Sequence, residues 1–177
     1  MEVVMGIFDL FRKKEPPAKS DAERGGSEAE HTTRHCFVLC GTAEPGDLSR
    51  AGGVVAQVFG RGYSADVAKG NIITVTHGKD TVGFLAPMPA PIPGGEAEEN
   101  ADGNFLWPDG RDEAAKHRSH VIVTNIGGAG DQTPVQSAIA VSRLALVAIR
   151  VFDGIGVRHR PSMIDEDRLV YKIVFEG

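Results

Sequence analysis

The chain has 177 residues and a formal net charge of −5 at pH 7, so it is long enough to bury one domain core without disulfides or metals. The acidic balance argues against a nucleic-acid-binding protein, because that function usually requires a basic face. No apolar run of membrane-spanning length and no signal peptide are recognised, which favours a cytoplasmic protein.

Residues 1–31 are expected to form a disordered tail, because they are polar and rich in proline, glycine and charge after one short apolar run. In that run, "MGIFDLFRKK", Ile7, Phe8 and Phe11 precede three cations and could hold the tail weakly to a membrane surface. A single short patch binds lipid poorly, so a frayed or partner-docking terminus is the favoured interpretation. One α+β domain is expected over residues 32–177.

The domain is expected to begin with a strand and a helix. The run "HCFVLC" is typical of a buried strand, in which Cys36 and Cys40 share one face but lie about 13 Å apart, too far for a disulfide. They are interpreted as small buried apolar residues of a reducing compartment, and a redox pair is the alternative. Residues 45–59 then predict a helix that Gly52 and Gly53 weaken.

A hairpin and a helical region follow. The segment "NIITVTHGKDTVGFLAPM" has two β-rich runs and predicts a hairpin with Gly78 in its turn. Residues 95–117 predict helix, interrupted at Trp107 and Pro108. The run "SHVIVTNI" then predicts a strand that is buried on both faces.

The last helix has the clearest sequence signals. Thr133 is a favourable N-cap, Pro134 suits the first helical position, and the apolar pattern continues to Phe152. The preceding "GGAGDQTP" is interpreted as a connector, with an anion cradle at the helix N-terminus as the alternative. The runs "GIGVRHR" and "RLVYKIVFEG" predict final strands around a loop "PSMIDED". This order of elements predicts an α+β fold, namely a ferredoxin-like sandwich with a mostly antiparallel sheet and helices on one face.

Prolines occupy every second position from Pro87 to Pro93. In an extended segment, alternate N–H groups point to the same edge, so these prolines remove every donor from one edge and leave the other able to pair. The spacing therefore predicts a stiff strand end or polyproline-like crossover. A rigid wall for a partner or ligand is the functional alternative.

An acidic stretch follows the prolines. Glu96, Glu98 and Glu99 stand at a predicted helix N-terminus, where the exposed N–H groups and the helix dipole stabilise carboxylates. The local excess of acid could also meet a cationic partner.

This part of the chain resembles an uncharacterised bacterial family that is known only as a domain of unknown function. The resemblance covers roughly residues 34–158 and consists of a Met-Pro-x-Pro-Ile-Pro stretch, a tryptophan in the next helix, and a His-x-x-His that leads into an apolar strand. The chain departs from the pattern at "GVRHR", where the family would have Gly-Val-Tyr-Trp. The resemblance implies a shared fold, brings no activity, and marks as binding candidates Met88, Pro89, Pro91, Ile92, Pro93, Trp107, His117 and His120.

Glu113, His117 and His120 are the best candidates for chemistry. Two nitrogens and one oxygen are ligand types of zinc or non-haem iron, and histidine also serves in acid–base catalysis. The helix must end between the two histidines, so the geometry is not that of a rigid HExxH motif. A helix cap and a hydrogen-bonded buried histidine form the favoured interpretation.

The sequence as a whole favours a protein-binding accessory or immunity-type factor without catalytic activity, because it is acidic and lacks a nucleophile motif such as GxSxG. The alternative is a metal-binding or hydrolytic enzyme centred on Glu113, His117 and His120. A sheet edge that proline does not block could also pair across a homodimer.

Overall fold

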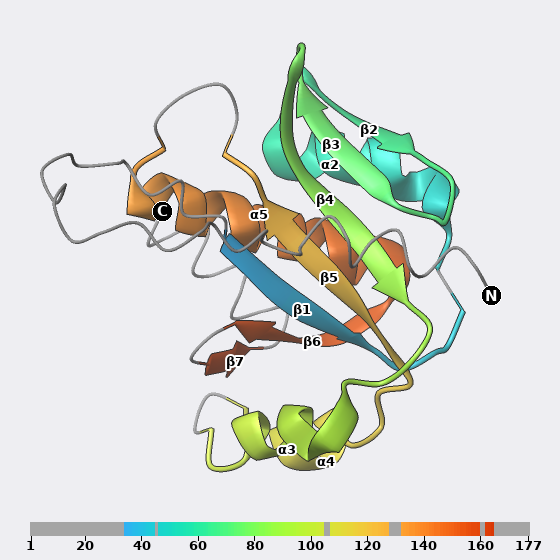
Figure 1. Cartoon of the computed structure of the whole chain (residues 1–177), viewed down its shortest axis with the longest axis vertical. Coiled ribbons are helices and arrows are strands. Elements are labelled where there is room, and N and C mark those ends of the chain that lie inside the picture. The colour runs from blue at the N-terminus through green and yellow to red at the C-terminus, as the bar shows by residue number, and fades with distance from the viewer. Residues whose placement is uncertain (1–33, 45, 105–106, 128–131, 160–161, 165–177) are drawn as a thin grey trace, which may run out of the picture. The chain divides into compact units, whose positions relative to one another are not determined.

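One antiparallel sheet organises the protein, with strand order β2-β3-β4-β5-β1-β6-β7 in the computed structural model (Figure 1). Strands β2 to β5 form a meander, and β1 lies between β5 and β6. The strands are β1 (Arg34–Cys40), β2 (Tyr63–Val67), β3 (Ile73–His77), β4 (Asp80–Met88), β5 (Ser119–Asn125), β6 (Gly154–His159) and β7 (Ser162–Ile164).

The structure describes residues 34–44, 46–104, 107–127, 132–159 and 162–164. The chain divides into two units, Met1–Glu30 and His31–Gly177, and every described residue belongs to the second. The predicted tail, most of the glycine-rich loop and the predicted strand "RLVYKIVFEG" lie outside the described residues.

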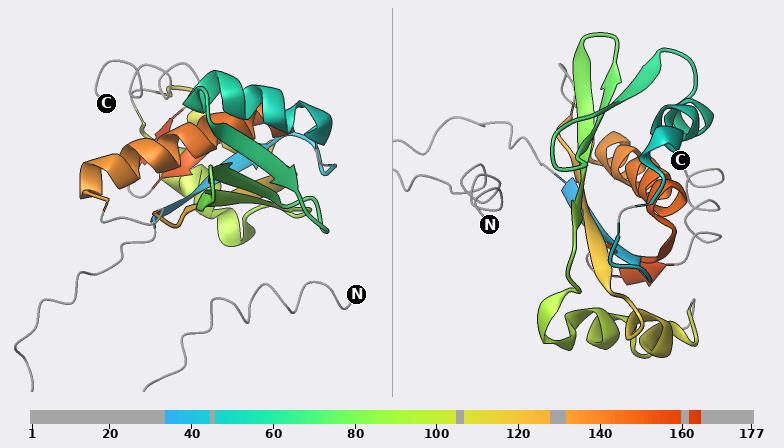
Figure 2. Two further views of the ribbon diagram at one scale, coloured as in Figure 1. Left: turned by 90° about the horizontal axis from the view of Figure 1, so that it is seen from above. Right: turned by 90° about the vertical axis from the view of Figure 1, so that its right-hand side faces the viewer.

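Helices pack on both faces of the sheet, so the prediction that they share one face is wrong. α2 and α5 cover one face and form the main core with β1, β3, β4 and β5 (Figure 2). α3 and α4 join a second core on the other face, beside β6 and β7. The helices are η1 (Leu48–Arg50), α2 (Ala51–Phe59), η2 (Pro93–Gly95), α3 (Glu96–Ala101), α4 (Gly110–Ala114) and α5 (Pro134–Phe152).

The α+β class and the antiparallel sheet are confirmed, while the ferredoxin-like assignment is not. Four strands lie between α2 and α5, whereas a βαββαβ unit has two. Strand β2 was not predicted, and β7 falls in the predicted loop "PSMIDED". The hairpin with Gly78 in its turn is confirmed, since that residue adopts a φ of 62° between β3 and β4.

α5 is the central helix of the main core. Thr133 and Gln136 form a reciprocal capping box at its start, as the N-cap signal predicts. By length and composition this helix could span a membrane, which corrects the expectation that no run is long enough. Most of it is buried, and its apolar side chains pack against the sheet and α2, which is the usual position of a core helix.

α2 forms despite two adjacent glycines. Gly52 and Gly53 each cost about 1 kcal/mol of helix stability relative to alanine. Nothing lies within 4 Å of a Cβ added at either residue, so the packing of the protomer itself does not require them. The opposite, buried side of the helix carries Ala51, Val54 and Val55.

Trp107 is the centre of the second core, which also contains Leu39 and Ile92. A Cβ at Gly156 would overlap the six-membered ring of this tryptophan, and a Cβ at Gly110 would lie 2.9 Å from its Cδ2 atom. Trp107 therefore fits against the sheet because two neighbouring backbone positions carry no side chain.

Replacing Gly156 by alanine is expected to destabilise the fold by about 1–3 kcal/mol, because the new methyl group would displace the Trp107 ring. Trp107 is the single tryptophan of the chain, so its fluorescence should shift to the red in the native variant. Urea unfolding followed by tryptophan emission measures both effects. Gly41→Ala is the control, since its Cβ would lie at an ordinary 3.8 Å from Ile155; an equal response of the two variants would contradict this packing.

Candidate functional site

The proline segment is the end of an inner strand with one edge free of pairing. On its β3 side, β4 pairs only as far as Leu85, which faces Ile73. On its β5 side, pairing continues through Pro87 to Met88, which faces His120. The predicted one-sided pairing is therefore present, although β4 lies inside the sheet and is not an edge strand.

The side chain of His117 binds the backbone of the proline segment. Its Nε2 atom accepts a hydrogen bond of 2.8 Å from the N–H of Ile92, and its Nδ1 atom lies 2.5 Å from the carbonyl oxygen of Ala114. A carbonyl oxygen can only accept, so Nδ1 carries a proton, while Nε2 presents its lone pair to Ile92. Both nitrogens of this buried side chain are thus occupied within the fold.

His120 binds the same segment two residues earlier. Its Nδ1 atom donates to the carbonyl oxygen of Ala90 at 2.8 Å, and its ring packs edge-to-face on Phe37 at 5.9 Å between ring centroids. Burial lowers the pKa of His120, the hydrogen bond to Ala90 raises it, and the nearby His117 lowers it further. The net direction is downward, which favours the neutral imidazole at neutral pH.

The predicted metal set is not assembled. His117 has no free nitrogen, and Glu113 forms an ion pair of 2.6 Å with Lys116. Throughout the described ranges, no group of three His, Cys, Asp or Glu side chains is placed to hold a metal ion. The histidines instead have the hydrogen-bonded structural role that was the favoured interpretation.

Cross-strand neighbours form three rows on the face of the sheet opposite α5. The row nearest α3 and α4 is Met88, His120, Leu39 and Gly156. The middle row is Ala86, Ile122, Phe37 and Arg158. The outer row is Thr74, Phe84, Thr124 and His35.

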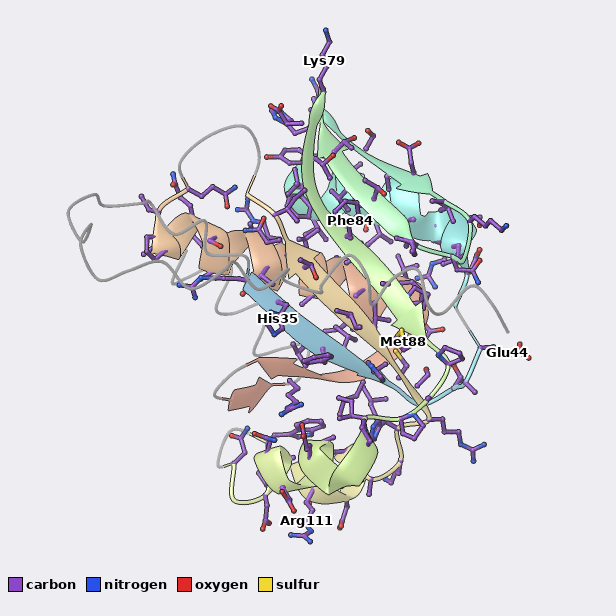
Figure 3. All side chains as sticks on the ribbon, in the orientation of Figure 1. His35, Glu44, Lys79, Phe84, Met88 and Arg111 are labelled. Atoms are coloured by element: carbon purple, nitrogen blue, oxygen red, sulfur yellow. The ribbon has the colours of Figure 1, made fainter. Side chains whose placement is uncertain are left out.

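The middle and outer rows form what we call the open face, namely Ala86, Ile122, Phe37, Arg158, Thr74, Phe84, Thr124 and His35. Among the described elements, α2 and α5 pack on the other side of the sheet, and α3 and α4 join the core around Leu39 and Trp107, against which Phe37 also packs. Figure 3 locates His35 and Phe84 along β1 and β4, away from α3 and α4. Phe37, Phe84 and Ile122 are only half-buried, so the open face has an apolar centre.

Arg158 connects the open face to α3. Its guanidinium lies 5.7 Å from the centre of the Phe37 ring and forms an ion pair of 2.8 Å with Glu96. Only 12% of the arginine side chain is exposed, so the aromatic ring and the carboxylate are its main surroundings. This residue belongs to the "GVRHR" end where the chain departs from the family pattern.

Residues 93–118, the helical cap, carry seven acidic and three basic residues. Two of the acidic side chains form ion pairs inside the cap, Asp102 with Arg111 and Glu113 with Lys116. Glu99, Asp109 and Asp112 are exposed, and within the described part of the chain no ion pair involves them. The cap is therefore an acidic border at one end of the open face.

A pocket of about 160 Å³ lies where β1 and β4 end and β5 begins. Cys40, Ser119 and Phe152 contribute to its lining, together with the loop at Glu44 and the turn at Asn71. Burial raises the pKa of Cys40 to about 11, so its thiol stays protonated and is a poor nucleophile at neutral pH. Burial likewise raises the pKa of Cys36 to about 12, which agrees with the interpretation of both cysteines as core residues.

The structure brings the predicted binding residues together but hides several of them. Ile92, Trp107, His117 and His120 are buried, while Pro89, Pro91 and Pro93 are exposed and Met88 is half-buried. Sequence reasoning missed the apolar centre of the open face. The apolar runs "CFVLC" and "VIV" indicate strands with two apolar faces, but not which face lacks a covering helix.

No protein-family model, curated protein or solved structure matches this chain. Membership of the family that the chain resembles therefore stays a prediction, and the functional argument depends on the geometry above.

Lowering the pH from about 7.5 to 5.5 is expected to reduce the free energy of unfolding. The pKa of His120 is lowered from 6.5 by folding, so the unfolded chain takes up the proton first as the pH falls. The loss should begin near the unfolded pKa and stop once the folded state is protonated as well.

Urea unfolding at several pH values measures this dependence. His120→Asn keeps a side-chain donor for Ala90 but cannot titrate, so its stability should depend less on pH than that of the wild type. His77→Asn is the matched control, because it removes an imidazole from an exposed position. An identical pH dependence of the wild type and His120→Asn would contradict the assignment.

Proposed function

We propose that this protein is a non-catalytic binding factor whose partner protein docks on the open face beside the acidic helical cap. The observation that carries the proposal is the apolar centre formed by Phe37, Phe84 and Ile122. A solvated face of an antiparallel sheet is normally polar, so an apolar one that the described helices leave only half-buried favours contact with another macromolecule.

Charge indicates the chemistry of the partner. Glu99, Asp109 and Asp112 are exposed on the cap, which covers the row next to the apolar centre, so a partner with an apolar patch and neighbouring lysine or arginine side chains fits best. The acidic border would speed the encounter and select against acidic partners, while burial of the apolar centre would supply most of the affinity.

The biological role that fits such a surface is that of an accessory or immunity-type factor in the cytoplasm. This part of the proposal is an analogy with small acidic α+β proteins and depends on the composition of the chain. The resemblance to the uncharacterised family and the ferredoxin-like comparison remain hypotheses of the same kind.

The enzyme alternative has less support. A metal at Glu113, His117 and His120 would have to displace one of the two hydrogen bonds of the His117 ring. Loss of the bond to Nε2 would leave the buried N–H of Ile92 without this partner. Stoichiometric zinc or iron in protein purified without a nickel column, lost in His117→Ala, would favour this alternative.

Neutralising the cap is expected to weaken partner binding by about tenfold, because two of its exposed carboxylates are lost. The variant is Glu99→Gln with Asp112→Asn. The matched control is Glu44→Gln with Asp80→Asn, which makes the same charge change at exposed positions outside the cap. Capture from a lysate of the native organism identifies the partner, and calorimetry with that purified partner measures the affinity.

A second variant, Phe84→Thr, tests the apolar centre, and it should weaken binding at every salt concentration. Binding should also weaken as salt is added to the wild type, because the border charges become screened. A partner that binds the cap variant, Phe84→Thr and the control equally would contradict the proposed surface, as would the absence of any partner.

A further inference from the structure

Strand β2 ends the sheet with an edge that no described segment pairs with. The N–H of Ala68 donates to Ile72 on the β3 side, and the carbonyl oxygen of Gly62 accepts from Gly78 on that side. Because backbone direction alternates along a strand, Ser64 and Asp66 also face β3. The N–H and C=O groups of the other three β2 residues therefore point outward, namely Tyr63, Ala65 and Val67.

This edge lacks three of the usual protections against pairing, namely proline, lysine and a bulge in its register with β3. Val67 is 48% exposed although it is apolar. The strand is also held firmly, since the ring of Tyr63 lies against Phe59 at 4.9 Å and stacks on His77 at 4.4 Å between ring centroids.

We propose that a second copy of this chain pairs with β2, antiparallel and edge to edge, with a two-fold axis at Ala65. The five strand residues are self-complementary in this register. Tyr63 faces Val67 of the second copy, which is a favourable aromatic and β-branched pair. Ser64 faces Asp66 of the second copy, so the two carboxylates do not oppose each other.

Neighbouring registers are less favourable. Moving the two-fold axis from Ala65 to Asp66 places Asp66 directly opposite its own copy, where like charges repel. Moving the axis from Ala65 to Ser64 places Ser64 opposite its own copy and leaves Val67 opposite the exposed cation Arg61 of the second copy. Only the register centred on Ala65 pairs all five residues of β2.

The surface of α2 fits this arrangement. A two-fold axis perpendicular to the sheet places both copies of α2 on the same face, next to each other. The exposed side of α2 carries Gly52, Gly53 and Ala56, small residues that allow two helices to approach closely. A contact between two copies gives these glycines a use that the protomer alone does not supply.

Sedimentation velocity over a range of concentrations tests the proposal. The wild type should form dimers, and Ala65→Pro should weaken dimerisation by about tenfold or more, because two hydrogen bonds across the axis are lost. The N–H of residue 65 points outward, so this proline removes no hydrogen bond within the protomer. Circular dichroism checks that the variant is folded.

A cysteine pair tests the register even if the proline variant fails to fold. Residues 65 of the two copies would form a hydrogen-bonded pair with Cα atoms about 5.5 Å apart, which suits a disulfide. Mild oxidation should therefore cross-link Ala65→Cys and leave the control Asp66→Cys largely monomeric on a non-reducing gel. The native cysteines are both buried and should not contribute.

A wild type that is monomeric at all concentrations would overturn the proposal. So would a dimer that survives Ala65→Pro in folded form, or equal cross-linking of the two cysteine variants. The dimer proposal is independent of the proposed partner surface. The variant Glu99→Gln with Asp112→Asn leaves β2 unchanged, so it should dimerise like the wild type. Added salt should not weaken the dimer, whose strand ends place Arg61 near Lys69 of the second copy.

Discussion

Two hydrogen bonds between histidine side chains and the backbone hold the proline segment in place, and the second core depends on them. Pro89, Pro91 and Pro93 cannot donate, so Ala90 and Ile92 supply the only N–H groups of this stretch. His117 accepts from Ile92, and His120 donates to the carbonyl oxygen of Ala90. Because these bonds join the end of α4 and the start of β5 to one short segment, they fix where the helical cap meets the sheet.

The position of the cap decides which part of the sheet is covered. Ile92 and Trp107 pack on Leu39, so Leu39, His120 and Gly156 of the row nearest the cap are buried, while Met88 is half-buried. In the next row, Phe37 packs against the margin of that core, whereas Ile122 belongs to neither core. The proline segment and its two histidines thus hold the cap against the sheet, while the side chains that we propose to bind the partner lie on the neighbouring row.

Much of the fold could be predicted from local patterns in the sequence. α5 begins with a capping box and a proline, and β1, β3, β4 and β5 are long apolar or alternating runs. β2 was missed because "YSADV" is short, half polar and follows a glycine turn, and it pairs with β3. Tertiary pairing, rather than propensity, makes it a strand.

The candidate site was predictable only in part. Proline spacing predicted one-sided pairing. The helix was expected to end between His117 and His120, whereas α4 ends at Ala114, before both histidines. The partners of the histidines could not be predicted, since Ile92 and Ala90 lie 25 and 30 residues away in the sequence. The contact of Arg158 with Phe37 and Glu96 joins three elements and likewise has no local signal.

The protonation of the two histidine rings tests the central claim most directly. A long-range proton–nitrogen correlation spectrum at neutral pH, recorded before and after addition of excess zinc, distinguishes the two tautomers and detects metal binding. The structural role predicts that both rings carry their proton on Nδ1 and that zinc leaves the signals of His117 unchanged. A proton on Nε2 of either ring, or a stoichiometric shift of the His117 signals by zinc, would contradict it.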